Sequence, residues 1–277
     1  MSPVDLSVIG RQTEPRWFEY TFKDVALYAL GVGASTAELP YIYENTPGGI
    51  RVLPTYAVIP AMFAYPPLGD IDLSRFLHGE QGIRLFRPLP PQGKIMIVGE
   101  VTDIWDKGKA AVYNIKVVGR DEAGRELFEA VFTNFYLGAG GFGGNPGPKA
   151  VPAAPPEGQA PDFSIPYRVA ENQAALYRLN GDLNPLHIDP DFARRGGQEQ
   201  PILHGLCTFG IAGRNIVNAV LGGDPTRLKS FKARFTSVVY LGDALTTDIW
   251  KKDEKNLIVQ VRTERGVVLG AAQAEID

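Results

Sequence analysis

The sequence has only one cysteine, Cys207, only three histidines and no marked excess of charge of either sign. A single cysteine excludes an intramolecular disulfide framework and any zinc or iron–sulfur site built from several cysteines, and it is typical of a reducing compartment. The formal net charge is −3, so no global positive field could hold nucleic acid or an anionic membrane. We therefore expect no nucleic-acid partner, and any recognition of phosphate must be local.

Long apolar runs are absent as well. The most apolar stretch, Val52 to Leu68, is broken by four prolines and cannot form a membrane span. The amino terminus carries charged residues instead of the apolar run of a signal peptide, and the final Ala-Glu-Ile-Asp is no recognisable peroxisomal signal. The sequence therefore predicts a cytoplasmic protein with no membrane partner. A peroxisomal location is the alternative if the unit comes from a longer eukaryotic chain.

The chain does have enough apolar material for a core, with 44% hydrophobic residues over 277 positions. A Gly/Pro-rich segment divides it, because residues 138–161 hold seven glycines and six prolines. Such a segment can bury almost nothing and is typical of a linker whose Gly-rich end is flexible. We therefore expect an N-terminal region over residues 1–137, a linker over 138–161 and a C-terminal region over 162–277.

The two regions resemble each other weakly but in register. Three matches share an offset of 149 residues: Tyr28 with Tyr177, Phe86 with Phe235, and Gly93 with Gly242. The triplet Asp-Ile-Trp at 103–105 also recurs at 248–250. Matches in this order predict a duplicated domain.

Each half is expected to begin with helix and end with strands. A short helix is predicted over 171–179 and a strongly apolar helix over 206–221. Alternating segments joined by short turns predict antiparallel strands over 94–105, 110–120, 126–137, 231–239, 244–250, 257–263 and 267–274. An apolar helix laid against an antiparallel sheet is an α+β fold.

The densest polar cluster lies on one short segment of the second half. Gly181 is expected to end the preceding helix and Pro185 to prevent its extension, so Asp182, Asn184 and His187 share an ordered turn. Asp182 and His187 could deprotonate and reprotonate one water molecule while Asn184 orients it. A purely structural role is the alternative, because Asx residues favour turns and a buried histidine can serve packing alone.

The apolar helix of the second half begins directly after Pro201-Ile202-Leu203-His204-Gly205. The unpaired N–H groups of a helix start can stabilise an oxyanion, and Gly205 lets a carbonyl group approach the backbone closely. We expect His204 to cap or pack at this helix entry, Tyr177 to belong to the core and Cys207 to pack inertly. The bases over 227–234 could meet phosphates or form a solvated strand face. The scattered histidines predict no metal site.

The segment Tyr177 to Asp189 resembles the signature of the hydratase 2 family, the MaoC-like (R)-specific enoyl-CoA hydratases. Residues 77–81, 138–144, 172–177 and 201–210 are similar to the hydratase domain of peroxisomal multifunctional enzymes of type 2. The resemblance runs from about Tyr20 onward. It implies a double hot-dog fold, in which two tandem repeats each have a long helix packed on an antiparallel sheet.

The family's reaction is the reversible hydration of trans-2-enoyl-CoA to (3R)-3-hydroxyacyl-CoA, a hydro-lyase step in fatty-acid β-oxidation or related acyl-CoA metabolism. The resemblance assigns Asp182 and His187 as the acid/base pair, Asn184 as the residue that positions water, and the Gly205 N–H as the group that polarises the thioester carbonyl. Positions matched to acyl-CoA contacts are His78, Gly79, Lys107, Leu183, Pro185, Leu186 and Phe235. His78 could equally be a structural anchor.

The resemblance also implies a homodimer and no cofactor besides the CoA carried by the substrate. The first-half counterpart of the catalytic turn, residues 31–34, has no Asp or His, so this half is expected to accommodate the acyl chain. An acyl-CoA thioesterase is the first alternative, because hot-dog folds also host thioester hydrolysis. A non-catalytic acyl-CoA-binding subunit is the second. The Gly-Asp-x-Asn-Pro-x-His turn argues against the thioesterase.

Overall fold

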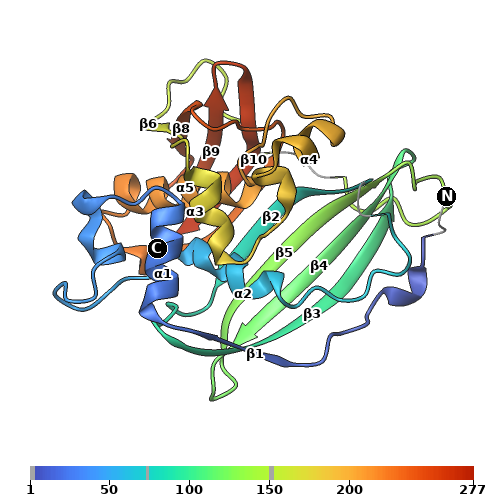
Figure 1. Cartoon of the computed structure of the whole chain (residues 1–277), viewed down its shortest axis with the longest axis horizontal. Helices are drawn as coiled ribbons and strands as arrows, with labels where there is room; N and C mark the ends of the chain where they lie inside the picture. The colour runs from blue at the N-terminus through green and yellow to red at the C-terminus, as the bar shows by residue number, and fades with distance from the viewer. Residues whose placement is uncertain (1–3, 73–74, 150–152) are drawn as a thin grey trace.

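The computed structural model describes residues 4–72, 75–149 and 153–277 (Figure 1). Its described strands form one antiparallel sheet in the order β1-β3-β4-β5-β2-β7-β10-β9-β8-β6. The first half supplies β1 (Arg16–Tyr20), β2 (Phe76–Leu85), β3 (Gly93–Asp106), β4 (Ala110–Arg120) and β5 (Glu126–Leu137). The second half supplies β6 (Phe163–Arg168), β7 (Leu228–Phe235), β8 (Ala244–Lys251), β9 (Asn256–Thr263) and β10 (Gly266–Ile276). The expected α+β fold on an antiparallel sheet is confirmed.

The two halves meet at the pair formed by β2 and β7, and the register of this pair is symmetrical. Gln81 lies opposite Ala233, and Arg84 lies opposite Ser230. Exchanging the halves by the 149-residue offset turns the first of these pairs into the second. An approximate twofold axis therefore passes between β2 and β7, and it relates the two ends of this strand pair to each other.

Matching helices also occur in the two halves. In the first half, α1 (Phe22–Gly31) begins with a capping box between Thr21 and Asp24. Its counterpart in the second half is α3 (Gln173–Tyr177), which continues as the 3₁₀ turn η5 (Arg178–Asn180). The two helices pack on each other, since Gly31 lies against Tyr177.

The central helices of the two halves differ in length. The second half has α5 (Gly205–Val220), whose residues from Leu206 to Val217 are all buried. The first half has only η3 (Pro54–Ala57) followed by α2 (Val58–Met62). The expectation of a long helix in each repeat is therefore wrong for the first half. Pro60 supplies no N–H and disfavours a regular helix, and two further prolines follow at 66 and 67.

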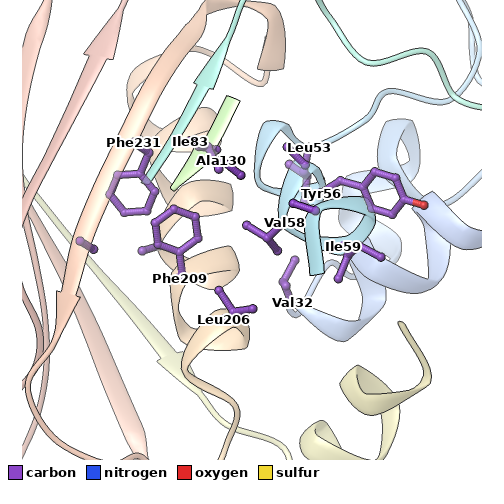
Figure 2. Packing of buried hydrophobic residues seen from close by; sticks show 14 of the residues in the cluster. Val32, Leu53, Tyr56, Val58, Ile59, Ile83, Ala130, Leu206, Phe209 and Phe231 are labelled. Carbon is purple, nitrogen blue, oxygen red and sulfur yellow. The ribbon is translucent and has the colours of Figure 1, made fainter. Parts of the chain in front are cut away.

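One hydrophobic core joins both halves. In Figure 2, Val58 of the first half points toward Leu206 and Phe209 of α5. Phe209 stacks on Phe231 of β7, with 4.4 Å between the ring centroids. The remaining short helices are η1 (Leu6–Val8), η2 (Thr36–Tyr41), η6 (Pro185–His187), α4 (Pro190–Arg195) and η7 (Pro225–Arg227). None of the helices in the described residues is long and apolar enough to cross a membrane.

The Gly-rich start of the expected linker is hydrogen-bonded to the end of β3. The carboxylate of Asp106 accepts hydrogen bonds from the N–H groups of Gly141 and Gly143, at 2.8 Å each. Several glycines here have positive φ, which lets successive N–H groups turn toward one anion. Residues 150–152 of the expected linker lie outside the described residues. The division at 138–161 stays a prediction.

The bounds of most predicted elements agree with the structure within two residues, but three strands were missed, and β7 begins at Leu228 instead of 231. β1, β2 and β6 were not predicted. β7 ends at Phe235 instead of 239. Beyond it the chain leaves the strand pair, and the carbonyl of Val239 accepts a hydrogen bond from the N–H of Leu203 at 2.7 Å. The segment after β7 therefore pairs with the approach to α5.

Candidate active site

A short polar turn connects η5 to η6 and contains Asp182 and Asn184. Gly181 ends the helical segment with φ of 122°, a conformation that favours glycine. The Asp182 Oδ1 accepts the Asn184 N–H at 3.3 Å, and the Asn184 Oδ1 accepts the Leu186 N–H at 3.1 Å. Through these bonds Asp182 and Asn184 stabilise the turn, which is the structural role that the sequence also allows for them. They leave the second oxygen of Asp182 and the amide nitrogen of Asn184 for other contacts.

His187 lies at the end of this turn and is buried. Its Nδ1 lies 2.9 Å from the carbonyl oxygen of Ile202. Because a carbonyl only accepts, Nδ1 carries the hydrogen and Nε2 keeps its lone pair. Burial lowers the pKa of His187 below its ordinary 6.5, against the opposing effects of the Ile202 carbonyl and Asp182. His187 is therefore a neutral imidazole near pH 7.

His204 packs directly against His187, with 3.7 Å between the ring centroids and 27° between the ring planes. Its Nε2–H donates to the backbone carbonyl of Asp182 at 3.2 Å. Burial and the neighbouring His187 lower the pKa of His204 to about 3, so this ring is neutral as well. His204 makes no side-chain cap for α5. It packs at the helix entry instead, beneath the ring of His187 and the turn of Asp182.

Asp182, His187 and His204 form a compact group. One potential ligand atom of each, a ring nitrogen or a carboxylate oxygen, lies within 4.8 Å of the others. These residues are the ones that could hold a small polar molecule or a metal ion. Each histidine already binds a backbone carbonyl through one ring nitrogen. His204 Nδ1 is buried and has no hydrogen-bond partner within the described part of the chain. Tyr177, whose ring lies 4.9 Å from that of His204, is fully buried in the core.

The start of α5 lies immediately after His204. Gly205 is its first residue, and the first N–H groups of a helix have no partner within the helix. A Cβ on Gly205 would come within 3.2 Å of the ring of Phe235, so the glycine keeps this approach open. The helix dipole adds partial positive charge at the same place. The site thus combines an unprotonated imidazole, a carboxylate and a helix start.

The first half contributes His78 to the same region. On β2, His78 contacts the ring of Phe235 of β7 edge-to-face, at 5.0 Å between centroids. Its Nε2–H donates to the carbonyl of Glu80 at 3.0 Å, and burial lowers its pKa to about 4. Gly79 follows, where a Cβ would collide with the ring of Phe135. His78 and Phe235 are therefore brought together with Gly205 across the two halves.

The other predicted contact residues lie on the Asp182 turn or between β3 and β4. Leu183 on the turn is 58% exposed, Pro185 is exposed and Leu186 is half-buried. Lys107 lies in the turn between β3 and β4, where its ammonium contacts the Trp105 ring and the Pro146 carbonyl. The described contacts of Lys107 do not include the Asp182 group.

The basic residues of β7 are engaged within the chain. Lys232 and Arg234 both pair with the buried carboxylate of Glu80 on β2, Lys232 at 2.9 Å. Lys229 pairs with Asp277 at 3.1 Å. These pairs lie across strands or at the chain end. They make the β7 bases poor candidates for binding phosphate beside the Asp182 group.

Two aromatic residues near the site were not found from the sequence. Phe63 lies against Gly181, where a Cβ would come within 2.7 Å of its ring. Tyr65 lies close enough for the charge of Asp182 to affect its pKa, which burial raises well above its ordinary value. Both belong to the first-half segment after α2. Nothing in the local pattern around Pro66 and Pro67 indicates that this segment reaches the second-half turn.

Comparison with known families covers almost the whole chain. Residues 18–138 match the model for the MFE-2 hydratase 2 N-terminal domain, and residues 152–271 match the model for the MaoC like domain. The first match lies in the half that contributes His78. The second contains the Asp182 turn and the start of α5.

Relatives and solved structures of high coverage agree with these matches. 3-hydroxyacyl-thioester dehydratase Y of Mycobacterium tuberculosis is 46% identical, over 98% of this chain and 94% of its own length. A probable enoyl-CoA hydratase 2 of Dictyostelium discoideum is 38% identical, over 93% of this chain and 90% of its own. The crystal structure of a MaoC-like dehydratase from Phytophthora Capsici superposes with a TM-score of 0.90 at 28% identity, covering 99% of this chain and 97% of that one.

Proposed function

This chain belongs to the MaoC-like hydratase 2 family and is a double hot-dog hydro-lyase, and we propose that Asp182 and His187 perform its hydration of 2-enoyl-CoA thioesters. The observation that supports these two residues is the neutral imidazole of His187 beside a carboxylate, next to the free N–H groups at the start of α5. These are the groups that addition of water to a conjugated thioester requires.

The proposed reaction begins with a water molecule between Asp182 and His187. His187 Nε2 or the Asp182 carboxylate accepts a proton while the water oxygen attacks C3 of the substrate. The Gly205 N–H donates to the thioester oxygen and stabilises the enolate that forms. The proton then returns to C2, so that one molecule of water has been added across the double bond. Asn184 orients the water through its amide.

The product is expected to be (3R)-3-hydroxyacyl-CoA by syn addition. The support for this stereochemistry is that the proposed acid, base and water positions all come from one turn, so a single face of the double bond meets them. His78 and Phe235 would hold the thioester next to Gly205. Gly79, Lys107, Leu183, Pro185 and Leu186 remain proposed contacts of the CoA and acyl parts. The first half would receive the acyl chain.

The proposed reaction needs no metal or redox cofactor, because the Gly205 N–H and the two neutral or anionic side chains supply the polarisation and the proton transfer. We therefore expect that treatment with a metal chelator leaves the hydration rate unchanged. A loss of activity that zinc restores would assign the Asp182, His187 and His204 group to a metal instead.

Two further proposals concern the state of the protein in the cell. We expect a homodimer, which sedimentation analysis would test. We also expect a cytoplasmic location, with a peroxisomal one as the alternative. Peroxisomal multifunctional enzymes of type 2 from Drosophila melanogaster and Mus musculus are each 38% identical to this chain.

The reaction type is tested by incubating the protein with a trans-2-enoyl-CoA. The proposal predicts loss of the absorbance of the conjugated thioester without release of free thiol. Release of CoA at a comparable rate would instead indicate a thioesterase. Tight binding without turnover, unaffected by Asp182→Asn, would indicate an acyl-CoA-binding subunit.

A further inference from the structure

A cavity opens at the opposite end of the β2–β7 pair from the Asp182 group. Its volume is about 510 Å³, within the range of small-molecule sites. Leu85 and Phe86 at the end of β2 line it, as does Leu228 at the start of β7. His78 and Phe235 mark the other ends of the same two strands. We call this cavity the dyad pocket.

The dyad pocket is built from the counterparts of the residues that build the active site. Phe86 stands 149 residues before Phe235, the ring beside Gly205. The lining residues Val52 and Pro54 lead into η3. The segment 201–203, which is 149 residues later, leads into α5. The twofold axis between β2 and β7 therefore relates the dyad pocket to the active site.

The chemistry of the active site is missing from the dyad pocket. The counterpart of Asp182 is Gly33, and the counterpart of His187 is Glu38. Glu38 is bonded to the buried Arg214, with distances of 2.8 and 2.6 Å from Nη1 to its two oxygens. Pro54 occupies the first position of η3 and has no N–H, and Tyr56, the counterpart of Gly205, donates its N–H to the Leu53 carbonyl at 2.9 Å. Neither an acid/base pair nor an oxyanion donor at the first helical position is in place.

What the dyad pocket does contain is an exposed aromatic ring and positive charge. Phe86 is 44% exposed. Arg51 and Arg87 line the pocket, and each donates one hydrogen bond to a backbone carbonyl, to Gly223 at 3.0 Å and to Glu126 at 2.9 Å respectively. A guanidinium has five N–H donors, so each keeps further donors for an anion.

Two more charged groups line the pocket and partly offset each other. The ammonium of Lys229 forms an ion pair with Asp277, at 3.1 Å. The Oδ1 of Asp224 accepts hydrogen bonds from the N–H and the hydroxyl of Thr226, at 3.0 and 2.7 Å. The cations among the lining residues still outnumber the carboxylate. An anion with a flat apolar part matches this combination.

We propose that the dyad pocket is a non-catalytic site for a phosphorylated nucleotide. The base would stack on Phe86, and the phosphates would bind Arg51 and Arg87 in the bidentate manner that guanidinium groups allow. CoA carries a phosphorylated adenine nucleotide, so a substrate or product of the proposed hydration can supply this ligand. The choice of CoA as the probe rests on the proposed function, whereas the pocket and its charges do not.

The test is the stoichiometry of CoA binding to the whole chain, measured by titration calorimetry. The wild type is expected to bind two CoA molecules per chain. The double variant R51E/R87E is expected to weaken the second site at least tenfold, and Phe86→Ala severalfold. Hydration at low substrate concentration should stay within twofold of the wild type. The charge-matched control R125E/R194E changes two exposed arginines outside the pocket and should keep both sites.

Three results would overturn the proposal. These are a single CoA site that R51E/R87E leaves intact, a second site that neither R51E/R87E nor Phe86→Ala weakens, and binding of dodecanoate but not of adenosine 3′,5′-bisphosphate in the pocket. A single CoA site that R51E/R87E removes would keep the dyad pocket and contradict the active site proposed at Asp182. The two proposals therefore fail in distinguishable ways.

Discussion

The two ends of the β2–β7 pair are built on one plan but carry different chemistry. At one end a turn with Asp182 and His187 meets a helix that begins with Gly205. At the other end the corresponding helix begins with Pro54, and the corresponding turn packs Gly33 against Tyr167 and pairs Glu38 with Arg214. The fold thus fixes where a ligand can enter, and a few residues at a turn and a helix start decide whether chemistry can follow.

In the first half, the positions that correspond to Asp182 and His187 have structural contacts instead. Gly33 has φ of 87° and lies so close to the ring of Tyr167 that a Cβ would come within 2.4 Å of its hydroxyl. Glu38 binds Arg214 of α5 instead of a ligand. Residues at catalytic positions in one half therefore join the two halves together in the other.

The largest effect is expected from removing the acid/base pair in the second half. Asp182→Asn or His187→Ala should lower kcat about 10²- to 10⁴-fold, because each change removes a proton acceptor. Melting temperature should change little for Asp182→Asn, since the amide can keep the turn bond to Asn184. Steady-state hydration rates measure this effect. The control Asp191→Asn changes an exposed carboxylate on α4, and a similar loss of rate there would contradict the assignment.

The next effect is expected from removing the first N–H of the second-half helix. Gly205→Pro removes the N–H that is proposed to bind the thioester oxygen and adds a ring whose Cβ approaches Phe235, and we expect kcat to fall about 10²- to 10³-fold. Proline suits the first position of a helix, and His204 before it already has φ of −55° and ψ of 133°.

Gly205→Ala is the matched control for this change because it keeps the N–H. Its Cβ approaches the Phe235 ring at 3.2 Å, so a modest rise in KM is expected. Equal losses of kcat in the proline and alanine variants would show that the backbone donor at Gly205 is not used.

A smaller effect, on stability alone, is expected in the first half. Gly33→Ala should lower the free energy of unfolding by about 2–4 kcal/mol, because it combines positive φ with overpacking against Tyr167. Gly10→Ala is the control, since Gly10 has φ of 78° but open space around it. Its cost should be about 1 kcal/mol. Urea unfolding measures the free energy of unfolding of both variants. Equal losses in the two variants would contradict the predicted overpacking at Gly33.

The smallest effect is the dependence of stability on pH. The folded-state pKa values of His204 and His78 lie near 3 and 4, below the value of about 6.5 expected in the unfolded chain. The unfolded state therefore binds protons first. The stability that these neutral rings contribute is present above pH 6.5 and is lost as the pH falls toward 4, by about 1 kcal/mol per histidine between pH 6.5 and 5.5.

Urea unfolding at pH 7 and 5.5 measures this loss of stability and can separate the contributions of His78 and His204. His78→Gln should remove the contribution of one histidine from the first half and leave that of His204. An unchanged slope in His78→Gln would contradict the neutral state of His78.

The sequence predicted regular strands and the polar turn well but not the meeting of the halves. Strands such as β4 and β5 alternate and are bounded by turn residues, so their ends agree with the structure. β2 was missed because its polar and glycine residues, among them Gly79 and Gly82, show no alternation. Its place at the centre of the sheet comes from pairing with β7, a contact that no local pattern encodes.

The site residues show the same division. The turn bonds of Asp182 and Asn184 follow from local chemistry that the sequence displays. The stacking of His204 on His187 and the approach of His78 to Phe235 depend on contacts between distant segments. Only the folded chain brings these rings together.

The most direct test of the account is the product that the protein forms from trans-2-enoyl-CoA substrates of increasing chain length. The account predicts (3R)-3-hydroxyacyl-CoA at every length that is turned over, and loss of this product in Asp182→Asn. Formation of the 3S product, or an equal yield of the 3R product by Asp182→Asn, would contradict the assignment of the chemistry to the second-half turn.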